Sequence, residues 1–187
     1  GIDDHDQYEF LRDFIGAVAA AGCRMFIVHA RKAILSGLSP RENRTIPPLR
    51  YDVVYRLKRE FPHLRIILNG GIRDSVSVGQ HLQYVDGVMI GREAYSNPYW
   101  LAELQAELLP GNAGLSREQI LLQMQEYAEC QLRAGIRLAH IGRHVLGLYA
   151  GQPGARHWRR FVMEQSRRPD ARAEILQHSL ECFKATA

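Results

Sequence analysis

The first half of the chain repeats a pattern of one short apolar run followed by a segment with helical spacing. The three apolar runs are rich in β-branched residues, and they predict buried parallel strands at Arg24–Ala30, at Ile66–Asn69 and at Gly87–Ile90. Between them, apolar residues recur every three or four positions. The expected helices cover Tyr8–Ala21, Tyr51–Phe61, Asp74–Gln83 and, with a break at Asn97-Pro98, Glu93–Leu109.

Two further features complete the pattern of the first half. In the first helix, the apolar face is expected to consist of Phe10, Phe14, Ala17, Val18 and Ala21. A loop from Arg31 to Arg50 separates the first strand from the next helix. A loop of that length inside a compact domain is usually functional or disordered.

A turn-rich segment, Pro110–Gly114, is the clearest domain boundary in the sequence. Beyond it the strand patterns stop, and Ser116 is a candidate N-cap for a first long helix. Three more helices are expected at about 138–149, 155–165 and 171–183. The sequence therefore predicts an α/β domain over residues 1–110 and a small all-α bundle over residues 111–187.

The small number of strands bears on the fold of the first domain. A closed barrel of alternating strands and helices needs eight strands and roughly 250 residues. Parallel strands with helices crossing between them belong either to a doubly wound sheet or to a closed barrel. Three such strands with glycine ends suggest the C-terminal piece of a larger protein, and the expected fold is the C-terminal portion of a (β/α)8 TIM barrel. The alternative, a complete three-stranded α/β domain, stays open at this point.

Composition and charge narrow the functional classes. The 187 residues include no apolar run near the roughly 20 residues of a membrane span, so no membrane association is expected. The cysteines Cys23, Cys130 and Cys182 show no paired spacing and are expected to be reduced thiols of a cytoplasmic protein. The net charge of +4 is uneven, because nine arginines and no lysine lie between Arg133 and Arg172. Arginine is suited to planar contacts with phosphates and bases.

Candidate chemistry gathers where the predicted strands end. Glycines follow the second and third strands, in Asn69-Gly70-Gly71 and in Gly91-Arg92, and glycine lets a backbone approach a phosphate closely. In βα barrels the loops after the last two strands are the usual phosphate site. His29 ends the first strand. It either faces the same ligand, a phosphorylated cofactor, or bonds only to nearby backbone.

Other reactive patterns in the sequence are weak. His140 and His144 have the spacing of a helical metal pair, but no carboxylate stands at ligand spacing beside them, so no metal site is expected. The sequence shows no convincing Ser/His/Asp or paired-carboxylate arrangement for catalysis.

Several motifs carry a resemblance to a known family. They are His29-Ala30-Arg31-Lys32, Leu35–Pro40, Asn43-Arg44, Ile46–Leu49, Asn69–Ile72, Asp86–Tyr95, Asn97-Pro98, Arg143–Tyr149, Pro153–Arg156 and Trp158–Arg160. Together they cover nearly the whole chain, which closely resembles the tRNA-dihydrouridine synthases, and within them the DusA-like subfamily.

The resemblance implies a flavin enzyme. FMN would lie over the barrel mouth, NADPH would reduce it, and the reaction would convert a uridine of the tRNA D-loop, at position 20 or 20a, to 5,6-dihydrouridine. His29 would contact the flavin, and the backbone of Asn69, Gly70, Gly71, Gly91 and Arg92 would hold its phosphate. The proton-donating cysteine of the family matches none of the three cysteines here and would lie in a preceding half. The chain alone is expected to be inactive, and the intact enzyme to be a monomer.

The basic residues are then candidates for contacts with tRNA. In the loop these are Arg41 and Arg44, and in the helical domain they are Arg143, Arg156 and Arg159. Two alternatives remain open. One is another FMN- or phosphate-binding barrel enzyme, such as a dihydroorotate dehydrogenase, although it has no use for an arginine-rich tail. The other is a non-catalytic RNA-binding module, although such a module has no need of glycine-ended strands.

Overall fold

The computed structural model describes residues 1–109, 111 and 114–184, and the chain divides into two compact units, Gly1–Gly91 and Arg92–Ala187. The division falls between the third strand and the helix after it. The boundary expected from the sequence, Pro110–Gly114, lies largely outside the described residues and stays a prediction. Among the described residues, no helix is long and apolar enough to cross a membrane.

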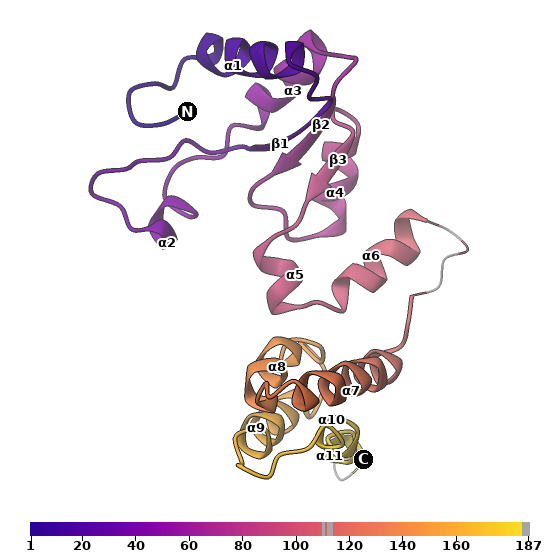
Figure 1. The fold of residues 1–187 in the computed structure, drawn as a ribbon. Coiled ribbons are helices and arrows are strands. Elements are labelled where there is room, and N and C mark those ends of the chain that lie inside the picture. The colour runs from indigo at the N-terminus through magenta and orange to yellow at the C-terminus, as the bar shows by residue number, and fades with distance from the viewer. Residues whose placement is uncertain (110, 112–113, 185–187) are drawn as a thin grey trace. The chain divides into compact units, whose positions relative to one another are not determined.

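The first unit contains a parallel three-stranded sheet in the order β1-β2-β3, with helices between the strands (Figure 1). The strands lie close to their expected positions. The elements of this unit are α1 (Tyr8–Ala20), β1 (Met25–His29), α2 (Pro40–Asn43), α3 (Tyr51–Glu60), β2 (Arg65–Asn69), α4 (Ser75–Leu82) and β3 (Gly87–Met89). Local signals set several ends. The Asp74 carboxylate caps α4 by accepting from the Ser77 N–H at 2.7 Å, and Pro62 follows the end of α3.

The two faces of this sheet differ in burial. On one face the side chains of Val28, Ile66 and Leu68 are buried, and they form a core with Val54 and Leu57 of α3. On the other face the side chains are largely open to solvent. This open face consists of Met25, Ile27, His29, Arg65, Ile67, Asn69, Gly87 and Met89. The sequence indicated buried strands, but in the described chain helices cover only one side of the sheet.

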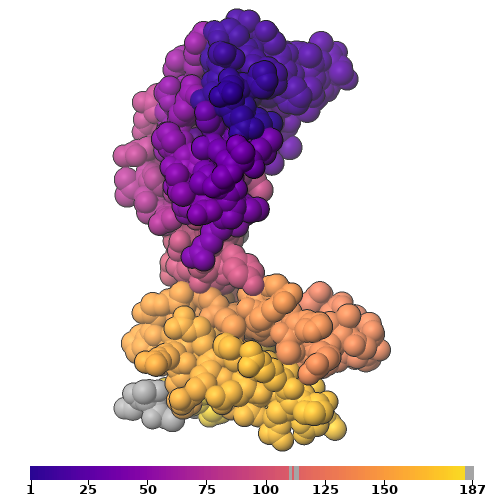
Figure 2. Space-filling view, turned by 90° about the vertical axis from the view of Figure 1, so that its left-hand side faces the viewer, coloured from indigo at the N-terminus to yellow at the C-terminus, as the bar shows by residue number. Residues whose placement is uncertain are grey.

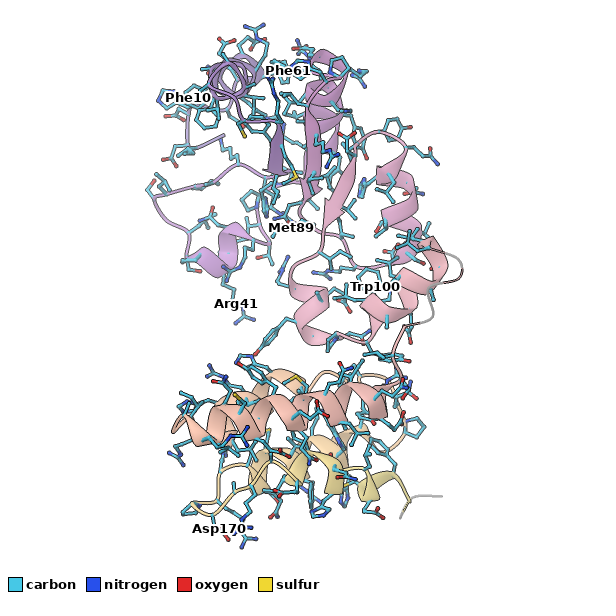
Figure 3. The ribbon with its side chains drawn as sticks, turned by 45° about the vertical axis from the view of Figure 1, so that its right-hand side comes forward. Phe10, Arg41, Phe61, Met89, Trp100 and Asp170 are labelled. Carbon is cyan, nitrogen blue, oxygen red and sulfur yellow. The ribbon has the colours of Figure 1, made fainter. Side chains whose placement is uncertain are left out.

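The first helix buries a different face from the one expected. Its buried residues are Tyr8, Ile15 and Ala19, whereas Phe10 and Phe14 are 53% and 59% exposed. Figure 3 shows Phe10 on the outer side of α1. Both stripes of the helix are apolar, so helical spacing alone could not tell which one faces α3 and the sheet.

The second unit is helical. Its elements are α5 (Arg92–Ser96), α6 (Trp100–Leu108), α7 (Arg117–Arg133), α8 (Leu138–Val145), α9 (Ala155–Gln165), α10 (Ile175–His178) and α11 (Glu181–Lys184). Ser116 caps α7, as expected, and it forms a capping box with Gln119. The single helix expected over 171–183 is wrong, because turns interrupt it on both sides of α10.

Trp158 of α9 lies at the centre of this unit's core and is fully buried. Its Nε1–H donates to the Ser179 hydroxyl at 2.8 Å, and that hydroxyl donates to the Leu176 carbonyl at 2.6 Å. The ring also packs near Tyr149, at 4.8 Å between centroids. In Figure 2 the orange and yellow residues of α7 to α11 form one closely packed body.

Candidate functional site

Parallel pairing places three side chains in a row at the carboxyl edge of the sheet. His29 is in register with Asn69, and Asn69 is in register with Met89. The Asn69 amide Nδ2 lies 3.4 Å from the Met89 sulfur. Figure 3 shows Met89 at this end of the sheet. Two of the predicted site residues are therefore neighbours, and Met89 is a third that the sequence reasoning missed. Its place beside Asn69 follows from the register of β2 with β3, which the sequence does not give.

The turn after β2 requires its two glycines. Gly70 and Gly71 have φ angles of +119° and +76°, which side chains rarely adopt. A Cβ on Gly70 would lie 3.1 Å from a Leu49 methyl and 3.3 Å from the His29 ring. A Cβ on Gly71 would lie 2.5 Å from a Leu49 methyl and 2.8 Å from the Tyr51 hydroxyl. The chain between β1 and α3 therefore packs directly on this glycine turn.

Backbone hydrogen bonds fasten the two strand ends and the returning loop together. The Ala30 N–H donates to the Asn69 carbonyl at 2.8 Å, and the Arg50 N–H donates to the Ala30 carbonyl at 2.8 Å. The Arg50 guanidinium also forms an ion pair with Asp6 at 2.8 Å. A small cavity of about 60 Å³ lies beside this junction, lined in part by His29, Arg31 and Arg50. The end of β1 after His29 is therefore fixed by hydrogen bonds to β2 and to the end of the loop.

The glycine after β3 lies in a different environment. A Cβ built on Gly91 would meet no described atom within 4 Å, and no left-handed φ is found there. Protein packing therefore does not require glycine at this position, and the space beside the backbone is open. Gly91 ends the first unit and Arg92 begins α5 in the second. The strand ends before Gly70 and Gly91 are adjacent, because β2 pairs with β3.

The long loop after β1 is an ordered structure. It contains the short helix α2, where the Ser39 hydroxyl and the Glu42 carboxylate form a capping box. Hydrogen bonding from Ser39 lowers the pKa of Glu42. Asn43 joins the two sides of the loop, because its amide binds both the N–H and the carbonyl of Ile34 at 2.7 Å. Arg41 is exposed, and Figure 3 shows it extending from α2 away from the sheet.

One basic residue of this region takes part in the structure of the loop itself. The Arg31 guanidinium donates to the carbonyls of Thr45 and Pro47, so it helps to hold the loop. Arg44 is exposed near the end of α2.

The predicted arginines of the helical unit fall in two places. Arg156 and Arg159 line an open depression of about 700 Å³ at the start of α9, together with Arg160 and His157. Its described lining contains no acidic side chain. Arg143 is on α8, and it is absent from this lining. Its Nε donates to His144 Nε2 at 3.1 Å, while His144 Nδ1 lies 3.1 Å from the Tyr95 hydroxyl.

The chain is an α/β protein in which the strand-end residues lie at the carboxyl edge of a parallel sheet, and a helical unit follows in sequence. In α/β folds this edge is the usual place for a ligand. The family model described as dihydrouridine synthase (Dus) matches residues 1–186, and the chain belongs to that family. This membership removes the dihydroorotate dehydrogenase alternative.

Several similar proteins bear the name tRNA-dihydrouridine(20/20a) synthase. The protein of that name from Vibrio parahaemolyticus is 52% identical over 96% of this chain and 56% of its own length. The one from Shewanella oneidensis is 52% identical over 95% of this chain and 53% of its own length. The one from Escherichia coli K12 is 51% identical over 97% and 53%. The chain therefore spans about half the length of these relatives.

Proposed function

We propose that this chain forms the cofactor-phosphate and tRNA-binding part of a flavin-dependent tRNA-dihydrouridine synthase that reduces uridine at position 20 or 20a with NADPH. The observation that carries the proposal is the row of His29, Asn69 and Met89 beside a two-glycine turn, in a chain matched by the dihydrouridine synthase family over residues 1–186. The relatives' names supply the substrate and the position.

The residues at the strand ends fit an FMN phosphate. Gly91 leaves open space beside the backbone that a Cβ would fill, although nothing in the described protein occupies it. The N–H groups of Asn69, Gly70, Gly71, Gly91 and Arg92 would hold the phosphate, and the exposed His29 ring would contact the flavin. When bound, the flavin supplies hydride for the C5=C6 bond of uracil.

The residues of this chain are proposed to bind the flavin and the tRNA, and none of them is proposed as the proton donor. Cys23 precedes β1, at the opposite end of the strand from His29, and its thiol donates to the Met25 carbonyl. Cys130 is exposed on α7, and Cys182 is buried in the helical core. The donor cysteine is therefore proposed to lie in the part of the full-length protein outside this chain.

The rest of the fold supports the same proposal. The open sheet face of Met25, Ile27 and Met89 and the exposed Phe10 and Phe14 are apolar surfaces of the kind that further barrel strands and helices bury. We therefore propose that residues 1–110 belong to a TIM barrel and residues 111–187 to a helical tRNA-binding domain. The full-length enzyme is proposed to be a cytoplasmic monomer.

Transfer RNA is proposed to bind through two basic regions. Arg156 and Arg159 line a depression without acidic lining, and no ion pair joins either residue to a described carboxylate. Arg41 and Arg44 are exposed on the ordered loop beside the first strand end, and Arg143 is exposed on α8. Exposed arginine side chains of this kind suit charge-assisted hydrogen bonds to RNA phosphates.

Two glycine variants of the full-length protein test the flavin site. Gly91→Val should lower the flavin content and the NADPH-dependent formation of dihydrouridine in tRNA, because its side chain enters the proposed phosphate space. Gly79→Val is the matched control, since Gly79 on α4 also has no described atom within 4 Å of a built Cβ. An unchanged flavin content in Gly91→Val would contradict the phosphate site.

Salt dependence tests the tRNA contacts. Each phosphate contact contributes about 0.7–0.9 to the log–log slope of affinity against salt. Arg156→Ala with Arg159→Ala should lower both affinity and slope, whereas Arg133→Ala with Arg137→Ala, exposed residues outside the depression, is the matched control. If Arg156→Ala with Arg159→Ala kept the wild-type affinity and slope, the depression would have no role in tRNA binding. RNA binding without flavin in the wild type would favour a non-catalytic module.

A further inference from the structure

The phenol of Tyr51 makes a direct hydrogen bond to the glycine turn. Tyr51 is the first residue of α3, and its hydroxyl donates to the Gly70 carbonyl at 2.8 Å. Burial raises the pKa of Tyr51, so the hydroxyl keeps its proton and remains a donor across the neutral range. The contact joins residues 19 positions apart in sequence, and nothing in the local sequence pattern pointed to it.

The bond fixes more than one carbonyl. The Gly70 carbonyl and the Gly71 N–H belong to one planar trans peptide, so they point in opposite directions. Both flanking glycines have positive φ angles, and glycine itself allows this peptide many orientations. Holding the carbonyl toward Tyr51 therefore turns the Gly71 N–H to the other side. Among the residues that the structure describes, this N–H donates no hydrogen bond.

The tyrosine ring is itself held in place. It packs on the buried His81 ring of α4, at 4.4 Å between centroids. His81 Nδ1 lies 2.7 Å from the Tyr55 hydroxyl, and Tyr55 stacks on Tyr84 at 4.4 Å. Tyr51 and Tyr55 are thus neighbouring tyrosines of α3 that contact the same histidine, but only Tyr51 reaches the glycine turn.

From this geometry we propose that Tyr51 is a positioning residue for the cofactor phosphate. Its hydroxyl orients the Gly70–Gly71 peptide so that the Gly71 N–H donates to the phosphate monoester of a flavin nucleotide. The inference rests on the proposed function, since it concerns the phosphate half of that flavin site. It assigns the preference for a phosphorylated flavin in part to a side chain that does not touch the ligand.

The test compares FMN with riboflavin, which lacks the phosphate, on the flavin-free full-length protein. Dissociation constants are measured by quenching of flavin fluorescence. Tyr51→Phe should weaken FMN binding about three- to ten-fold, the effect of one neutral hydrogen bond, and leave riboflavin binding unchanged. Tyr55→Phe, the matched loss of a hydroxyl on the same helix, should keep the wild-type ratio of the two constants. This ratio does not depend on the fraction of folded protein, so a partly unfolded variant still gives an answer.

The outcomes separate this inference from the function on which it rests. A wild-type protein that prefers FMN, with the same preference retained in Tyr51→Phe, overturns the positioning role alone. Equal weakening by Tyr51→Phe and Tyr55→Phe also overturns it, since the aromatic packing rather than the Gly70 bond would then matter. A wild-type protein with no preference for FMN over riboflavin overturns the proposed phosphate site and the inference with it.

Discussion

Replacement of Gly71 by alanine should destabilise the protein without any ligand being present. The new Cβ would lie 2.5 Å from a Leu49 methyl and 2.8 Å from the Tyr51 hydroxyl, and the residue would have to keep a φ of +76°. A left-handed conformation costs a residue with a Cβ roughly 1–2 kcal/mol, and overpacking costs about 1–3 kcal/mol. The expected loss in the free energy of unfolding is therefore about 2–5 kcal/mol.

Urea denaturation of the flavin-free full-length protein, followed by circular dichroism, measures this loss. Gly91→Ala is the control, because its Cβ meets no described atom, and its free energy of unfolding should change by less than about 0.5 kcal/mol. In Leu49→Ala with Gly71→Ala, removing the Leu49 methyls relieves the closest contact. The double variant should therefore lose less than the sum of the two single variants.

Two results would refute this reasoning. Wild-type stability in Gly71→Ala would mean that the turn moves freely away from Leu49 and Tyr51. Strict additivity in the double variant would mean that the cost comes from backbone conformation alone. In the first case Gly71 would be a clean position for testing the phosphate site, whereas in the second its backbone conformation alone would still make the variant unstable. Gly91 is the better position because a side chain there meets only open space.

Three further predictions concern the two units. Ser179→Ala should lower the free energy of unfolding by about 1–3 kcal/mol, because the buried Trp158 Nε1–H loses its acceptor; in a Trp158→Phe background the same change should cost clearly less. Burial lowers the pKa of His81, so the folded state disfavours its protonated form. Urea titrations should therefore show the free energy of unfolding falling as the pH drops below about 6.5. An equally steep fall in His81→Gln would contradict this. Burial raises the pKa of Tyr149 to about 12, so the folded state favours the neutral phenol. The free energy of unfolding should therefore be unaffected by this group below about pH 10 and should fall as the pH rises toward about 12. Tyr149→Phe should reduce this alkaline fall, and an unchanged dependence on pH would refute the prediction.

The elements themselves could be read from the sequence because their signals are local. The three apolar runs became strands, and Ser116 became a helix cap. Each of these outcomes depends on neighbouring residues and on the intrinsic freedom of the backbone. The long loop was also identified, but its helix α2 and the Ser39–Glu42 capping box were not anticipated.

The choice among faces and partners was decided by tertiary packing. The first helix has two apolar stripes, and only contact with the sheet and α3 selected Ile15 and Ala19 over Phe10 and Phe14. The segment expected as one helix after residue 171 broke into α10 and α11, where Trp158 is bonded to Ser179 in the turn between them.

For the candidate site, the sequence by itself determined which residues stand at the strand ends, namely His29, Asn69 and the glycines that follow β2 and β3. Only the tertiary structure put Met89 beside Asn69 and the Tyr51 hydroxyl on the Gly70 carbonyl. The physical reason is distance along the chain. Strand ends and turns follow from residues within a few positions of each other, whereas sheet register and the Tyr51 contact depend on the packing of elements about 20 residues apart.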